Sequence, residues 1–151
     1  MAYIDESGVE QDLQPTHGRA LRGVKIYGRV NGRRYGRTNV IGAKLNGKHI
    51  GVLSYNFSTN SDFFEAWLTM WLFPLLPKGT AIILDNATFH RKSELYKIAA
   101  EYGYLLIFLP PYSPDKNPIE HSWANMKRWL RKNASCFDTI QDAIVAYFNT
   151  A

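Results

Sequence analysis

Residues 80–109 read TAIILDNATFHRKSELYKIAAEYGYLLIFL. The stretch opens and closes on continuous apolar runs, Thr80–Leu84 and Tyr104–Leu109, of the kind found in strands that are covered on both faces. A polar segment of about ten residues that begins at Arg91 separates the two runs and suits a helix. The stretch therefore predicts a β-α-β unit with parallel strands, which places the chain in the α/β class.

Three further strands are predicted before this unit. Residues 2–6 form one of them, and two β-rich runs between Thr38 and Tyr55 flank the dipeptide Asn46-Gly47. Asparagine and glycine tolerate the positive φ that both central residues of a type I′ hairpin turn adopt. We therefore predict a mixed sheet of about five strands flanked by helices. A chain of 151 residues is the size of one domain, so we predict a single domain over residues 1–151.

Helices are predicted on both sides of the β-α-β unit along the chain. Residues 63–73 are apolar apart from a narrow polar stripe, which indicates a largely buried helix, and Asp62 and Glu65 have the spacing of a capping box at its start. After a proline-rich loop, further helices are expected from Pro118 to about Lys132 and from Asp138 to Phe148. No apolar stretch reaches the ~20 residues that a membrane span needs, so no membrane role is expected.

The positive charge is concentrated in one part of the chain. The formal net charge is +5, and residues 13–61 contain no Asp or Glu but nine of the 18 Lys and Arg side chains. Such a run is either an ordinary solvated face or a surface for the phosphates of a nucleic acid. Cys136 is the only cysteine, and no secretory leader is recognisable, which favours a reducing, intracellular compartment.

Asp85 is the first candidate for a functional acid. It lies where an apolar strand ends, and carboxylates at that edge of a parallel strand tend to face the crevice in which α/β proteins bind ligands. It is equally suited to cap the helix that follows. Asn86 and His90 lie near enough in sequence to support such a carboxylate by hydrogen bonding, although the spacing of His90 alone is better explained by an ordinary surface histidine.

Two other acids are candidates on weaker grounds. Alternation along the first strand puts Asp5 and Glu6 on opposite faces, and the residues alone do not decide which of them faces the Asp85 side. Both are equally well explained as exposed acids near a terminus. Glu120 completes a capping box with Asn117 as N-cap and Pro118 as the first helical residue, and this structural role is sufficient by itself.

Chemistry gives a reason to group three acids. Cleavage of a phosphodiester by two metal ions needs ions ~3.5 to 4 Å apart, one beside the attacking oxygen and one beside the leaving oxygen. Hard cations such as Mg²⁺ take carboxylate ligands from separate rigid elements. Three carboxylates ~5 Å apart would repel by roughly 3 kcal/mol per pair at an effective dielectric of about 20. A cluster of this kind therefore implies a metal.

Three motifs carry a resemblance to a known family. They are Ile4-Asp5-Glu6-Ser7-Gly8, LDNATFHR at residues 84–91, and LPPYSPDKNPIE at residues 109–120, which Trp123 follows. These motifs resemble the catalytic motifs of bacterial insertion-sequence transposases of the Tc/mariner superfamily. The third motif is the most specific, and the 34 residues from 86 to 119 that separate Asp85 from Glu120 also match this group. The resemblance runs from residue 4 to residue 123 and covers most of the chain.

The resemblance implies a ribonuclease-H-like fold in which Asp5, rather than Glu6, joins Asp85 and Glu120 in binding two Mg²⁺ or Mn²⁺ ions. The implied activity is hydrolysis that frees the transposon ends, followed by attack of the 3′-hydroxyl on target DNA. Glu120 would then serve both as a ligand and as part of a helix cap. The residues expected to orient these ligands by hydrogen bonding are Asn86, His90 and Asn117.

The resemblance also sets the expected partners. Members of the family carry an N-terminal helix-turn-helix region that recognises the transposon ends, and nothing of this kind precedes the first strand. We therefore expect DNA as substrate, a separate recognition region or partner chain, a homodimer as the assembly to test, and a location at the nucleoid in bacterial cytoplasm. The candidates for DNA contact are Arg19, Arg22, Arg33, Arg34, Arg37, Lys127 and Arg131.

Two other functions stay open. The chain is alternatively a stand-alone nuclease of the same fold, which would cut DNA and leave no strand-joined product. It is otherwise a non-catalytic DNA-binding or assembly module, whose acids are only helix caps and surface charges. Metal binding that depends on Asp85 would exclude the module.

Overall fold

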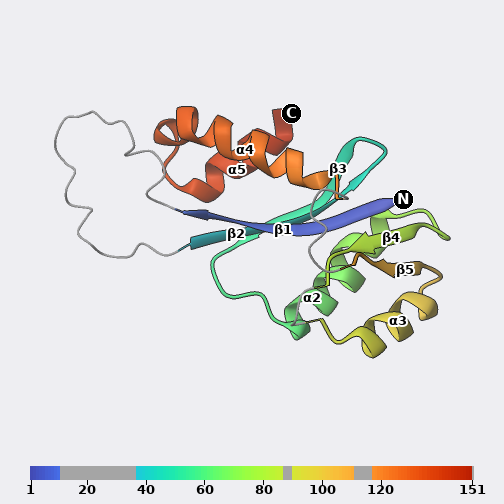
Figure 1. Ribbon diagram of the computed structural model, residues 1–151. Helices are drawn as coiled ribbons and strands as arrows, with labels where there is room; N and C mark the ends of the chain where they lie inside the picture. Colours follow the sequence, from blue (N-terminus) through green and yellow to red (C-terminus); the bar gives the residue numbers. More distant parts are fainter. Residues whose placement is uncertain (11–36, 87–89, 111–116, 151) are drawn as a thin grey trace. The chain divides into compact units, whose positions relative to one another are not determined.

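The computed structural model describes residues 1–10, 37–86, 90–110 and 117–150 (Figure 1). Its strands form one five-stranded sheet in the order β3-β2-β1-β4-β5. This confirms the predicted number of strands and their assembly into a single sheet. The strands are β1 (Ala2–Glu10), β2 (Arg37–Leu45), β3 (Lys48–Tyr55), β4 (Ala81–Leu84) and β5 (Leu105–Phe108).

The sheet combines an antiparallel hairpin with parallel strands. A two-residue turn joins β2 to β3, and its residues Asn46 and Gly47 have φ values of 52° and 80°. Positive φ at both positions is what the predicted type I′ turn requires. On the other side, β1 pairs with β4 and β4 pairs with β5, both in parallel. The β-α-β unit is therefore confirmed, with α3 (Lys92–Glu101) between β4 and β5.

The described residues fall into two compact units. The first unit contains the described residues among 1–6, 41–53 and 58–122, and the second contains the others. The first unit holds β4, β5, the helices between residues 61 and 101, and part of each remaining strand. The prediction of a single domain stays a prediction.

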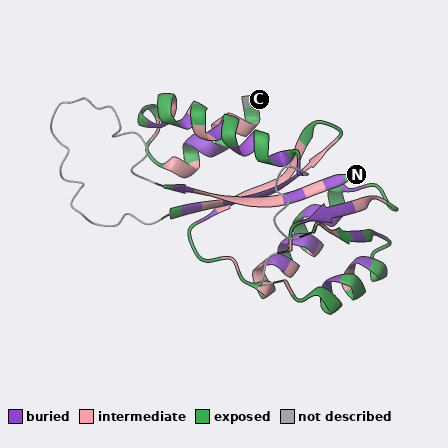
Figure 2. Ribbon diagram, in the orientation of Figure 1, coloured by how far each residue is buried: buried purple, intermediate pink, exposed green. Residues whose placement is uncertain are grey.

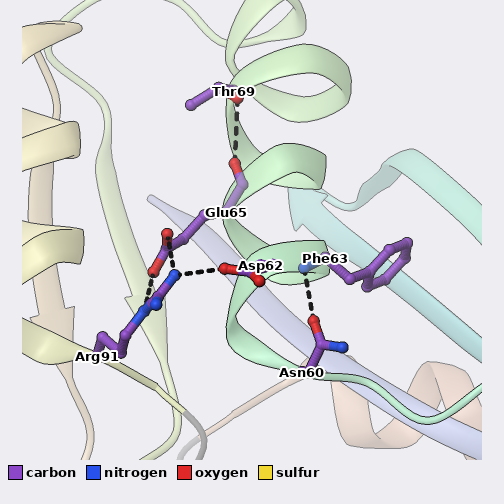
Figure 3. Close-up of polar contacts among 6 residues, drawn as sticks. All are labelled: Asn60, Asp62, Phe63, Glu65, Thr69 and Arg91. Atoms are coloured by element: carbon purple, nitrogen blue, oxygen red, sulfur yellow. Dashed lines mark hydrogen bonds and ion pairs between the residues drawn. The ribbon is translucent and has the colours of Figure 1, made fainter.

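In the first unit, the helix after the hairpin differs from its prediction. It begins at Ser61 because Asn60 is its N-cap, with an extended backbone and a side chain that accepts a hydrogen bond from the Phe63 amide at 2.8 Å. The predicted capping box of Asp62 and Glu65 is therefore wrong, and both carboxylates bind Arg91 instead (Figure 3). The helical segments are α2 (Ser61–Trp67), a π-helical turn η2 (Leu68–Leu72) and a 3₁₀ turn η3 (Phe73–Leu75).

This helical segment is buried on one side only. Phe64, Trp67 and Leu72 are buried, and the Trp67 indole donates a hydrogen bond to the Gly51 carbonyl of β3 at 2.8 Å. Met70 and Trp71, by contrast, are 72% and 50% exposed, so the segment is less buried than its apolar composition predicts. No helix in the described part of the chain is both long and apolar enough to cross a membrane.

The second unit is built on two C-terminal helices. Most of α4 (Ile119–Asn133) lies in it, together with a 3₁₀ turn, η5 (Ala134–Cys136), and α5 (Ile140–Thr150). One side of α4 is buried along the whole helix, while the opposite side is exposed (Figure 2). Trp129 packs on Tyr147 of α5 with ring centroids 5.5 Å apart. The buried residues of α4 are Ile119, Ser122, Trp123, Met126 and Leu130.

Candidate metal centre

Two neighbouring strands bring Asp5 beside Asp85. The parallel register of β1 and β4 pairs Ala2 with Ile82 and Tyr3 with Ile83. Two residues further along, the same register sets Asp5 opposite Asp85, the residue that follows β4. Side chains opposite one another in a parallel pair point to the same face. The two aspartates therefore share one face of the sheet.

A buried asparagine attaches the start of α4 to β1. Asn117 is 3% exposed, and its Nδ2 donates a hydrogen bond to the Ile4 carbonyl at 3.2 Å. Its Oδ1 accepts one from the Ile119 amide at 3.3 Å, and its backbone carbonyl accepts one from the Glu120 amide at 3.1 Å. One residue thus caps the helix that carries Glu120 and holds it against the residue before Asp5.

Electrostatics shows that Asp5 and Glu120 are close. Burial, together with a hydrogen bond to Glu120, raises the pKa of Asp5 to about 8, and the charges of Glu120 and Asp85 act in the same direction. A hydrogen bond from the Glu6 backbone opposes this shift. Carboxylates that crowd one site cannot all ionise without a counter-charge, so a proton is retained. Both other predicted acids therefore lie close enough to Asp5 to act on its carboxyl group.

Glu6, the alternative to Asp5, has a different neighbour. Its carboxylate accepts a hydrogen bond from the Thr59 hydroxyl at 2.6 Å. Asp5, and not Glu6, makes the contact with Glu120. The geometry thus separates two residues that strand alternation left tied.

His90 lies against Asp85 and is not a surface histidine. Its side chain is only 2% exposed, and its Nε2 lies 3.4 Å from Oδ1 of Asp85. The imidazole packs on Phe64, with ring centroids 4.5 Å apart. The expectation that spacing alone favoured, an ordinary exposed histidine, is therefore wrong, because aromatic neighbours from α2 and β5 cover the ring.

A small cleft with room for about one water molecule opens beside these residues. Among residues 1–10, 37–86, 90–110 and 117–150, no group of three or more His, Cys, Asp or Glu side chains is close enough to form a ready-made ion site. Asp85 lies at the open side of this cleft, since its side chain is 55% exposed. The cleft is lined by Ile4, Asp5, Glu6, Ile41, Phe64, Leu84, Asp85 and His90.

For the other predicted residues that lie in the described ranges, the structure gives burial and position but no side-chain contact with the three acids. Asn86 follows Asp85 directly and is half-buried. Of the candidates for DNA contact, Arg37 and Arg131 are exposed and Lys127 is half-buried, all in the second unit. The guanidinium of Arg37 lies over the backbone of Gly8. Arg19, Arg22, Arg33 and Arg34 lie outside the described residues.

Two features near the acids were not predicted. The first is the pairing of Arg91, a residue of the second motif, with Asp62 and Glu65. The only signal for it in the sequence is the close spacing of the two acids, which favours a cation between them. Lys44 of β2 donates a hydrogen bond to the buried Ser122 hydroxyl at 3.3 Å, two residues after Glu120. No periodicity in the sequence indicates that pair.

The sheet order, the helices around it and the interacting acids define a ribonuclease-H-like α/β domain with an acidic site. A family model described as DDE superfamily endonuclease matches residues 1–141. The chain belongs to this family. No curated protein matches it at the level of sequence.

Solved structures share the fold. The pre-cleavage Mos1 transpososome matches with a TM-score of 0.73 and 15% identity, over 99% of this chain and 48% of that chain. The Mos1 transposase paired-end complex with left transposon end matches with a TM-score of 0.71 and 15% identity over the same shares. A simian T-cell lymphotropic virus intasome in complex with PP2A regulatory subunit B56 gamma matches with a TM-score of 0.61 and 9% identity, over 97% and 46%. The chain spans about half the length of these proteins, and the predicted ribonuclease-H-like fold is confirmed.

Proposed function

We propose that this chain is the catalytic domain of a DNA transposase in which Asp5, Asp85 and Glu120 hold two divalent ions, Mg²⁺ or Mn²⁺. The observation that carries the proposal is the pKa of Asp5, which burial and the neighbouring Glu120 and Asp85 raise to about 8. An acidic cluster that keeps a proton near neutral pH is stabilised when a divalent cation replaces that proton, because the cation offsets the repulsion between the carboxylates.

The donor set fits such ions. All three ligands are carboxylates on separate elements, which is the chemistry that Mg²⁺ and Mn²⁺ prefer. Asp5 and Glu120 are already in contact, and the 55% exposed side chain of Asp85 is accessible to an incoming ion. The parallel register of β1 and β4, which sets Asp85 opposite Asp5, supports a site shared by these residues.

Metal ions at this position would activate an attacking oxygen and stabilise the leaving oxygen of a phosphodiester. The chain itself supplies the positions of the ligands. Asp5 gives up its proton when the cation binds, Asn117 holds Glu120 close to β1, and His90 supports one oxygen of Asp85. No side chain is needed as a general base in this arrangement.

The substrate we propose is DNA. The chain belongs to the DDE superfamily endonucleases, and the solved structures that share its fold include a Mos1 transpososome. We infer cleavage at transposon ends followed by joining of the 3′-hydroxyl to target DNA. A recognition region or partner chain would select the ends, and a homodimer would pair them. Bacterial insertion-sequence origin and a place at the nucleoid in the cytoplasm complete the proposal.

Two measurements on the 151-residue chain test the function. Calorimetry with Mn²⁺ is expected to show binding that Asp85→Ala abolishes. Incubation of short duplexes bearing free 3′-hydroxyl ends with a supercoiled plasmid is expected to give joined products in Mg²⁺ or Mn²⁺. Nicked plasmid without joined product would indicate a stand-alone nuclease. Absence of metal binding would overturn the catalytic proposal and favour an assembly module.

A further inference from the structure

A charged clamp connects α2 to the start of α3. The Arg91 guanidinium donates to both carboxylate oxygens of Glu65, from Nε at 3.0 Å and from Nη2 at 2.8 Å (Figure 3). Nη2 also donates to Oδ1 of Asp62 at 2.8 Å. Glu65 is 17% exposed and Asp62 is 87% exposed. The bidentate contact to Glu65 is therefore the one shielded from water, and bidentate arginine–carboxylate pairs fix geometry as well as energy.

The residue before Arg91 is held by the residue before Glu65. His90 packs on Phe64 with ring centroids 4.5 Å apart, and on Phe108 of β5 with centroids 5.9 Å apart. Two consecutive residues of α2, Phe64 and Glu65, thus contact the two consecutive residues His90 and Arg91 in the segment that follows β4. The gripped imidazole places its Nε2 3.4 Å from Oδ1 of Asp85.

Asp85 needs such support because more than half of its side chain is open to solvent. It follows the last residue of β4, and its side chain is 55% exposed. Fixing an exposed carboxylate in one orientation when a metal binds costs conformational entropy. The cost is smaller if a neighbouring residue already restricts the rotamers of that carboxylate. Residues that orient a metal ligand commonly change metal affinity when they are replaced. The neighbour that restricts Asp85 is His90, and contacts with α2 hold His90 in its position.

We propose that Arg91 is a positioning residue for the acidic site: its bidentate clamp on Glu65 holds His90 against Asp85 and so orients that carboxylate for metal. The proposal rests on the proposed function, because it assumes that Asp85 is a metal ligand. Arg91 itself touches neither metal nor DNA in this arrangement. Its effect is therefore expected in metal affinity and in the metal concentration needed for activity.

The test is a double-mutant cycle in Mn²⁺ affinity, measured by calorimetry on the full chain. Arg91→Gln and Glu65→Gln are each expected to weaken Mn²⁺ binding by about 5-fold. The double variant is expected to be no weaker than either single variant, since both remove the same clamp. Lys97→Gln, which neutralises an exposed cation on the same helix, serves as the matched control and is expected to bind Mn²⁺ like the wild type.

Thermal unfolding of each variant separates positioning from stability. A purely structural clamp would lower the melting temperature and leave the Mn²⁺ affinity of the folded protein unchanged, and that result overturns the proposal. If Arg91→Gln does not fold, Arg91→Lys carries the test, because lysine keeps the charge but cannot bind in a bidentate manner. It is expected to bind Mn²⁺ about 3-fold more weakly. Failure of the wild type to bind Mn²⁺ would instead overturn the proposed function, and this inference with it.

Discussion

Two acidic pairs in the first unit have opposite electrostatic surroundings. Asp62 and Glu65 share the guanidinium of Arg91, with an oxygen of each carboxylate 2.8 Å from Nη2. Asp5, by contrast, has a pKa raised to about 8 by burial and by its hydrogen bond to Glu120, so it keeps its proton near neutral pH. In the part of the chain that the structure describes, no lysine or arginine forms an ion pair with Asp5 or Glu120.

The difference separates a structural acidic pair from a candidate ligand pair. A carboxylate pair that receives its cation from the chain is fully compensated once the protein folds. A pair that receives none is left with repulsion, which either a proton or a bound cation relieves. Asp5 and Glu120 are of the second kind, and the third acid, Asp85, adds to the same repulsion. Substitutions in the two pairs should therefore differ in their effects on metal binding and on stability.

The largest effect is expected from Asp85→Ala. Removing one of three carboxylates should abolish Mn²⁺ binding and lower the rate of DNA strand cleavage on the order of 1,000-fold. Cleavage of a labelled duplex under single-turnover conditions measures it. Glu94→Gln, which neutralises an exposed acid in the first turn of α3, is the control and should cut at the wild-type rate. Equal rates for Asp85→Ala and wild type would exclude Asp85 from the site.

Asp5→Asn should change how stability depends on pH in metal-free protein. The folded-state pKa of Asp5 is raised from an ordinary 3.8 to about 8, so between these values the folded state holds a proton that the unfolded state releases. The free energy of unfolding therefore falls as pH rises through this window and is lowest above about pH 8. Asparagine removes the penalty.

The expected difference between Asp5→Asn and wild type is about 2 kcal/mol at about pH 9, after allowance for solvent screening at this partly buried site, and close to none at about pH 4. Urea unfolding in a chelator measures it. A variant with the same pH dependence as the wild type would show that Asp5 does not carry the raised pKa. The same variant should also lose Mn²⁺ affinity, which Glu65→Gln loses only in part.

The fold was predictable where local signals agree with it. Apolar runs gave β4 and β5, and Asn46-Gly47 gave the hairpin turn, because each pattern has one dominant structural solution. The start of α2 was missed for the same kind of reason: Asp62 and Glu65 fit a capping box, but Asn60 caps the helix first. A local pattern cannot show that a distant Arg91 competes for both carboxylates.

The sequence names residues for the candidate site, but it does not indicate the contacts that support them. Motif resemblance named Asp5, Asp85 and Glu120, while strand alternation alone left Asp5 tied with Glu6. The burial of His90 depends on Phe64 and Phe108, which come from elements far apart in the sequence. Contacts of that kind follow from packing and have no local signature.

Asn117→Ala tests whether the attachment of α4 to β1 holds the unpaired acids together. The buried side chain caps α4 and also donates to the Ile4 carbonyl, so its loss should lower the free energy of unfolding by about 2 to 3 kcal/mol. Asn60→Ala removes an exposed cap from α2 and should cost only about 1 kcal/mol. Urea unfolding compares them. Mn²⁺ affinity should fall in Asn117→Ala alone, and an equal loss in both variants would argue against a role for the attachment.

Asp62→Asn should have the smallest effect of all. Its carboxylate is 87% exposed and makes one contact with Arg91, which keeps both of its contacts with Glu65. Exposed ion pairs contribute little, so the free energy of unfolding should change by less than about 0.5 kcal/mol. Mn²⁺ affinity should stay within about 2-fold of the wild type, because the contacts that hold His90 in place, those of Phe64 with His90 and of Glu65 with Arg91, remain. A loss of affinity as large as that of Glu65→Gln would mean that the charge of the acidic pair, and not the bidentate geometry of Glu65, positions the segment that carries His90.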